Sequence, residues 1–263
     1  MDSNGFDLHL PGAAIRRFYV ALVGGTALLL LATALSDLRL TIVANSIGAQ
    51  LDLKREGNVA VWYSSAVLLM AAAAAFATAT RSPAGSDRTE WRRLLSAACA
   101  LSFLGLSIDE TAQLHERAGV QFTQRLGTIP FLTEGGGPTF AWLLVLLPFI
   151  VLFIAFVLAA VRRSDLHQRS CRLLLSGLAC WIGVLLAEFV EAQLVRWSID
   201  RSLQGVIEEG LELTGATLFL IGFMDWLSAA SKEGPAVATR RGRAATGSMA
   251  PSCIAPTLRE ESK

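Results

Sequence analysis

The stretch Thr139–Val161, which reads TFAWLLVLLPFIVLFIAFVLAAV, contains no residue that is charged at neutral pH along its whole length. An α-helix rises 1.5 Å per residue, so about 20 predominantly apolar residues cross the hydrocarbon core of a bilayer. Two other stretches, Phe18–Ser36 and Val59–Thr80, meet the same condition. These three segments predict membrane-spanning helices and indicate an all-α fold.

Three shorter apolar runs, Leu94–Ile108, Leu173–Ala187 and Leu213–Met224, each have acidic residues on one side. With these runs the sequence predicts a bundle of six transmembrane helices, at about 17–37, 58–80, 93–115, 138–161, 171–195 and 204–228. The organisation that follows is a cytoplasmic N-terminal segment (1–16), a six-helix transmembrane domain (17–228) and a disordered cytoplasmic tail (229–263). Paired glycines in the later helices are expected to permit close helix packing, namely Gly177, Gly183, Gly215 and Gly222.

The composition supports a membrane protein and excludes other classes. Hydrophobic residues make up 53% of the 263 residues, charged residues only 17%, and the net charge is +1. A chain without a basic excess has no electrostatic footprint for nucleic acid, so the bilayer is the expected partner. The four cysteines form no metal-binding or disulfide pattern.

The distribution of Lys and Arg predicts the orientation of the helices. With six spans, 16 of these residues fall on the side of the termini and 7 on the other side. The basic side of a membrane protein faces the cytoplasm, so both termini should be cytoplasmic in a bacterial inner membrane. The first apolar run is longer than the core of a signal peptide, which favours an uncleaved anchor.

Acidic residues collect on the opposite, outer side, which holds 13 of the 22. Acids contribute little to membrane insertion, so topology alone does not require this asymmetry. Within the clusters, acids recur at spacings that put them on one helix face: Glu188 with Glu191, Glu208 with Glu212, and Asp109 with Gln113 and Glu116. Carboxylates facing lipid are costly, so these faces should point into the bundle or a wet cavity.

Several carboxylates in a medium of low dielectric constant need protons, basic side chains or a metal ion as compensation. Basic residues are few on this side, so the sequence predicts a site for one or two Fe or Mn ions. The candidate ligands are Glu110, His115, Glu116, Glu188, Glu191, Glu208, Glu209 and Glu212, with Glu56 and Asp109 as peripheral candidates. The Glu-x-x-His pairs of two-iron bundles are missing, which argues against that type of centre.

Three motifs carry a resemblance: Asp52-Leu53-x-x-Glu56-x-Asn58 before Trp62-Tyr63-Ser64-Ser65, Asp-Glu-x4-His-Glu at 109–116, and Glu-Glu-x-Leu-Glu-x-x-Gly at 208–215. In these motifs the chain resembles a group of small, uncharacterised bacterial multi-pass membrane proteins over about residues 15–228. The resemblance implies no activity. It implies that Glu56, Asn58 and Ser64 belong with the carboxylate clusters.

Three functions remain open at this point. The first is a metal-binding inner-membrane protein, such as a redox enzyme that acts on a lipid or quinone near the outer leaflet. The second is a proton- or cation-coupled transporter in which the same acids bind the coupling ion. The third is an accessory subunit of a membrane complex. The residue pattern identifies neither catalytic residues nor an oligomeric state.

The orientation can be tested with a fusion protein. A reporter enzyme attached after residue 230 should be active in the cytoplasm, because the Lys and Arg residues divide 16 to 7 between the two sides. Activity of that fusion in the periplasm would overturn both the orientation and the outer location of the acids.

Overall fold

The computed structural model describes residues 12–37, 45–55, 57–81, 87–126, 141–163, 166–196 and 202–246. Helices make up 95% of these described residues, which contain no strand, so the expected all-α fold is confirmed. The helices are α1 (Gly12–Asp37), α2 (Asn45–Leu51), α3 (Val59–Arg81), α4 (Asp87–Ala112), α5 (Leu114–Leu126), α7 (Ala141–Arg163), α8 (Gln168–Arg196) and α9 (Ser202–Thr246).

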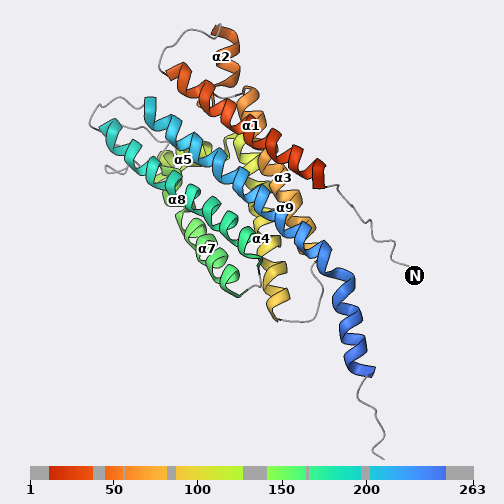
Figure 1. Cartoon of the computed structure of the whole chain (residues 1–263). Coiled ribbons are helices and arrows are strands. Elements are labelled where there is room, and N and C mark those ends of the chain that lie inside the picture. The colour runs from red at the N-terminus through yellow and green to blue at the C-terminus, as the bar shows by residue number, and fades with distance from the viewer. Residues whose placement is uncertain are drawn as a thin grey trace, which may run out of the picture.

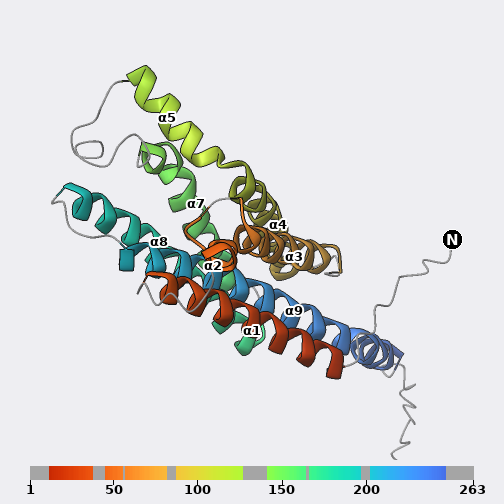
Figure 2. The same cartoon turned by 90° about the horizontal axis from the view of Figure 1, so that it is seen from above.

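Helix α9 contacts α1, α3 and α8, and its C-terminal end extends beyond these helices (Figure 1). Helix α4 packs on α3, and α7 packs on both α4 and α5. The view from above shows α1 lying along α9, with α7 and α5 on the far side of the bundle (Figure 2). Because α1 and α9 are antiparallel, the start of α1 and the C-terminal half of α9 lie at the same end of the molecule (Figure 1).

Four of the helices in the described ranges are long and apolar enough to cross a membrane, over Ala13–Ser36, Val59–Arg81, Thr89–Ala112 and Gln168–Val190. These segments agree with the expected spans 1, 2, 3 and 5. The other two expected spans are occupied by α7, whose apolar part Leu146–Ala159 is shorter, and by α9, whose N-terminal part carries Glu208, Glu209 and Glu212. The structure therefore fits a multi-pass membrane protein.

Two helices were not expected, and one is longer than expected. Helix α2 precedes the second span and α5 follows the third. Helix α9 continues beyond residue 228 to Thr246, through the first part of the segment expected to be disordered. The rest of that segment, 247–263, and the N-terminal residues 1–11 lie outside the described residues.

The prediction that Asp109, Gln113 and Glu116 form one continuous helical stripe is wrong. The chain leaves the helix at Gln113, whose φ of 53° is in the left-handed region that side chains other than glycine seldom adopt. Helix α5 starts afresh at Leu114, and the Asp109 carboxylate accepts the backbone N–H of His115 at 2.8 Å. That hydrogen bond replaces the one that a continuing helix would supply, and so it stabilises the break.

Polar side chains pair between helices instead of facing the surroundings. The Thr26 hydroxyl of α1 lies 3.1 Å from the Thr217 hydroxyl of α9. The hydroxyls of Ser65 on α3 and Ser107 on α4 each donate to the carbonyl of the other residue, at 2.8 and 2.9 Å. Small hydroxyl residues let helices approach closely and satisfy their polar groups within the bundle, as is usual in membrane proteins.

The expected close packing at the glycines occurs where α8 crosses α9. A Cβ atom at Gly215 would lie 2.5 Å from Trp181 Cδ1 and 3.2 Å from the carbonyl oxygen of Gly177. Next to this crossing, aromatic rings of α4, α8 and α9 pack with centroids 4.9–6.0 Å apart. The rings belong to Phe103, Trp181, Phe219, Phe223 and Trp226.

Replacing Gly215 with alanine should therefore destabilise the protein by about 1–3 kcal/mol, since the indole of Trp181 would have to move. Gly24→Ala is the matched control, because a Cβ atom there meets nothing within 4 Å. Both substitutions favour the helix intrinsically, so the difference between them isolates packing. Thermal unfolding in detergent measures it, and equal midpoints for the two variants would contradict the close crossing.

Candidate functional site

A cavity of about 560 Å³ lies between α4, α5, α7, α8 and α9, next to the segment that joins α2 to α3. Acidic side chains from four helices line it: Asp109, Glu110, Glu116, Glu188, Glu208, Glu209 and Glu212. His115 lines it as well. The structure thus brings seven of the eight main candidate residues, together with Asp109, around one space, while their roles stay predictions.

The remaining candidates cannot be placed at this cavity. The side chain of Glu191 and the whole of Glu56 lie outside the described residues. Asn58 and Ser64, which the resemblance connected with the acids, are buried elsewhere, with 8% and 3% of their surface exposed. Neither of them lines the cavity.

Each of the four helices carries its acids at the end that lies beside the cavity. Glu110 is close to the C-terminal end of α4, and Glu116 is in the first turn of α5. Glu188 is in the C-terminal third of α8, whereas Glu208 and Glu212 are near the start of the antiparallel α9. The cavity also extends along α8 into the bundle, from Glu188 to Leu178. These positions are ten residues apart, or about 15 Å along the helix.

Asp109 and His115 form the best-defined polar pair of the site. The carboxylate oxygen Oδ2 of Asp109 lies 2.6 Å from Nδ1 of His115, and Oδ1 accepts the backbone N–H of the same residue. One carboxylate therefore fixes both the start of α5 and the orientation of the imidazole. Since Asp109 occupies Nδ1, the nitrogen left for exchange with a ligand is Nε2.

The pKa of His115 is raised above its ordinary value. Burial acts in the opposite direction and favours the neutral ring, but the hydrogen bond to Asp109 and the negative charges of Asp109, Glu116 and Glu212 outweigh it. The protonated imidazole is thus the form that the site stabilises.

Two tryptophans complete the walls of the cavity. The ring of Trp142, on α7, meets the His115 ring edge to face, with centroids 5.1 Å apart. The indole N–H of Trp181, on α8, donates to the carbonyl of Glu212 at 3.2 Å. Trp142 is 27 residues after His115 in the chain, so only the tertiary structure reveals its contact with the candidate histidine.

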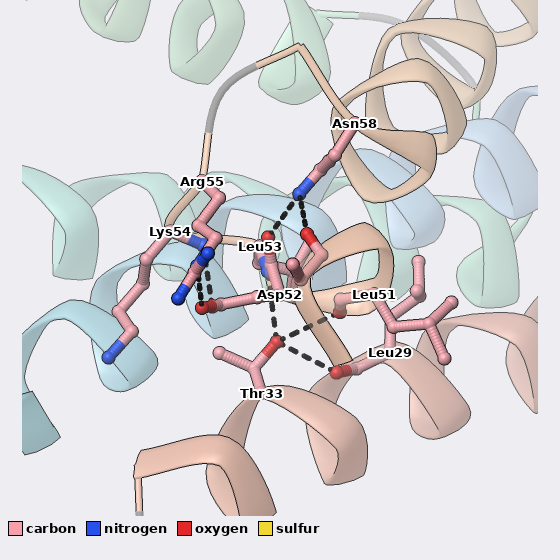
Figure 3. Close-up of polar contacts among 9 residues, drawn as sticks. Leu29, Thr33, Leu51, Asp52, Leu53, Lys54, Arg55 and Asn58 are labelled. Carbon is pink, nitrogen blue, oxygen red and sulfur yellow. Dashed lines mark hydrogen bonds and ion pairs between the residues drawn. The ribbon is translucent and has the colours of Figure 1, made fainter. Parts of the chain in front are cut away.

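The segment between α2 and α3 is held by a compact set of hydrogen bonds (Figure 3). The Asn58 side chain donates to the carbonyls of Ala49 and Asp52, at 3.1 and 2.6 Å, and accepts the N–H of Val61. The Thr33 hydroxyl of α1 accepts the N–H of Leu53 at 3.0 Å. Asn58 therefore caps α3 and ties this segment together.

This segment brings two basic residues to the cavity, Lys54 and Arg55, which sequence reasoning missed. Arg55 also pairs with the buried carboxylate of Asp52 at 3.2 Å. The aliphatic part of the Lys54 side chain lies against Gly205 of α9. A Cβ atom added to Gly205 would lie 2.9 Å from Lys54 Cδ. The sequence signal was present in Lys54-Arg55 beside Glu56, but nothing in it shows that these residues meet α9.

The donor set has the chemistry of a metal site but not its close geometry. Carboxylates and one imidazole suit Fe or Mn. Within the described ranges, however, no three His, Cys, Asp or Glu side chains come close enough together to hold an ion. The described acids come from four helices at one end of the cavity and do not form a compact ligand group.

The fold and the site together fit the class of helical multi-pass membrane proteins with an acid-lined cavity. Within that class, the chain belongs to the family described as a domain of unknown function, DUF8692, whose model matches residues 16–227. This range agrees with the extent of the resemblance to uncharacterised membrane proteins. No curated protein and no solved structure matches the chain.

The role of Asp109 can be tested by titrating His115. Asp109→Asn keeps an oxygen that can accept the N–H of His115 but removes the negative charge, so the pKa of His115 should fall. The stability that the charged pair contributes should be complete below the unfolded histidine pKa of about 6.5 and be lost as pH rises through the raised folded pKa.

NMR of imidazole-labelled protein measures this pKa, and the chain has only three histidines to assign. Asp225→Asn is the control, since Asp225 binds Ser170 at the opposite end of the bundle. An unchanged His115 titration in Asp109→Asn would rule out the proposed cause of the shift.

Proposed function

We propose that this chain is a six-span inner-membrane protein with cytoplasmic termini, and that its cavity is the acid–base site of an enzyme acting on a lipid-like or quinone-like substrate. The observation that carries the proposal is the Asp109–His115 pair at a cavity with both acidic and apolar walls. Pockets of this size, with a few convergent polar groups, are the usual form of small-molecule sites.

The pair has the arrangement that acid–base catalysis needs. A carboxylate on Nδ1 fixes the tautomer and the orientation of the ring, so that Nε2 can donate or accept a proton. Glu116 and Glu212 line the same cavity and act electrostatically on this ring. In this proposal Nε2 of His115 gives a proton to the bound substrate and recovers it from the outer side.

The inner end of the cavity favours an enzyme over a transporter. Trp181 lines the cavity, and its ring packs on Phe219 at 4.9 Å and on Phe103 at 5.6 Å. Phe223 and Trp226 continue this aromatic cluster along α9. A site closed on one side by packed rings suits a substrate that enters and leaves by the same side.

Metal binding is the second candidate function for the same residues. The convergence of acids from four helices favours it, because a divalent ion would offset their repulsion. Glu110, Glu188 and His115 would be the first ligands to consider. The described side chains form no three-ligand group, so no step of the reaction is assigned to a metal.

The enzyme proposal can be tested in cells from which the gene has been deleted. Mass spectrometry of their lipid and quinone extracts should reveal an altered species, which the intact protein restores and His115→Gln does not. Loss of a general acid–base group typically costs at least about a hundredfold in rate. His167→Gln makes the same chemical change at an exposed histidine away from the cavity and should restore the profile fully.

Full restoration by His115→Gln would contradict an acid–base role for this residue. Unaltered extracts after deletion would contradict an enzyme of lipid or quinone chemistry and favour the transporter. Elemental analysis of the purified protein tests the second candidate function, metal binding. Stoichiometric Fe or Mn that is lost in Glu188→Gln would favour the second candidate.

A further inference from the structure

The cavity has two chemically different ends, which restricts what can fill it. The acids and His115 are at the end where α4 meets α5 and α9 begins. Toward the other end the walls are apolar and come mostly from α7 and α8. These residues are Leu146, Phe149, Ile150, Phe153 and Ile154 on α7, and Leu178, Ile182 and Leu185 on α8. An occupant that satisfies both ends needs a polar head and a hydrocarbon chain.

The charge of the polar end selects the head group. Among the described residues, seven acidic side chains line the cavity against three basic side chains, Lys54, Arg55 and His115. Arg55 is already paired with Asp52, outside the cavity lining. The described acids outnumber the bases even when His115 is protonated and one of the acids is neutral, so an anionic head such as a phosphate or a fatty acid would be repelled.

The arrangement of the acids suits an organic cation better than a metal. A metal ion needs several ligand atoms at about 2.0–2.6 Å, which requires a tight cluster of side chains. Among the described side chains no such cluster exists, and the acids surround the space from several sides. An ammonium group is larger and can be held by a looser ring of carboxylates, with support from the faces of aromatic rings such as that of Trp142.

We propose that the cavity binds a single-chain amphiphile with a cationic ammonium head, the head among the carboxylates and the chain against α7 and α8. This inference rests on the proposed function and names the substrate class of the same site. It differs from a neutral quinone, which would gain nothing from the excess of acids, and from a metal ion, which would leave the apolar walls unused.

The binding test uses the full-length protein in phosphatidylcholine nanodiscs and dodecylamine as the probe. Three comparison compounds separate the two ends of the ligand: dodecanol has the chain without the charge, butylamine has the head with a short chain, and dodecanoic acid reverses the charge. A bound ligand raises the thermal unfolding midpoint. Dodecylamine should act at a concentration at least about tenfold lower than any of the other three.

Variants at the polar end should change the affinity in opposite directions. Glu188→Gln and Glu209→Gln each remove one negative charge and should weaken dodecylamine binding by about tenfold. Lys54→Gln removes a competing positive charge and should strengthen it. Glu90→Gln, at an exposed position near the start of α4, is the control and should leave the affinity unchanged. Opposite effects in variants of the same cavity cannot arise from a general loss of folding.

Each alternative outcome overturns the proposal in a recognisable way. Equal effects of dodecanol and dodecylamine would exclude selection of a cationic head, and equal effects of butylamine would exclude the chain-binding wall. No stabilisation by dodecylamine would exclude this occupant. Dodecylamine binding should survive in His115→Gln, although this variant should not restore the lipid and quinone profile. The two proposals can therefore fail separately: full restoration by His115→Gln would contradict the chemistry alone, and absence of dodecylamine binding would contradict the ligand class alone.

Discussion

The backbones of Gly177 and Gly215 lie against each other where α8 crosses α9. A Cβ atom added to either glycine would lie 3.1–3.2 Å from the carbonyl oxygen of the other. This contact fixes how the two helices are aligned, and the rest of the site follows from the alignment. It lets Trp181 reach the Glu212 carbonyl, and it brings Glu188 within electrostatic range of Glu212. Without a close crossing, the acids of α8 and α9 would be kept apart by side chains.

Much of the fold could be predicted from the sequence, because long apolar runs leave little choice. Phe18–Ser36 and Val59–Thr80 can only be satisfied as helices in lipid or in a large core. The break at Gln113 could not be predicted in this way, since glutamine is a good helix former and the acidic spacing continues across it. What decides the break is a side chain four residues earlier, Asp109, whose carboxylate accepts the N–H of His115.

That acids from several helices would face one cavity could also be predicted, because lipid excludes carboxylates from the outside of a bundle. The position of two basic residues at the same cavity could not, since Lys54 and Arg55 precede a helix and resemble ordinary loop residues. Their position depends on Asn58 and Thr33, which bind backbone groups of the same segment. The contact of Lys54 with Gly205 joins residues about 150 positions apart, and no local pattern encodes such a pairing.

Protonation of His115 and binding of a cationic head group depend on each other, because both involve the same carboxylates. The carboxylate of Asp109 favours the protonated form of His115, with smaller contributions from Glu116 and Glu212. A cationic head group among the same carboxylates would offset that charge, and it would lower the affinity of His115 for its proton. By linkage, ligand binding and proton release favour each other to the same extent. An enzyme that needs a neutral imidazole as its base would thus obtain it when the substrate arrives, and the protonated, ligand-free state would hold the acids together until then.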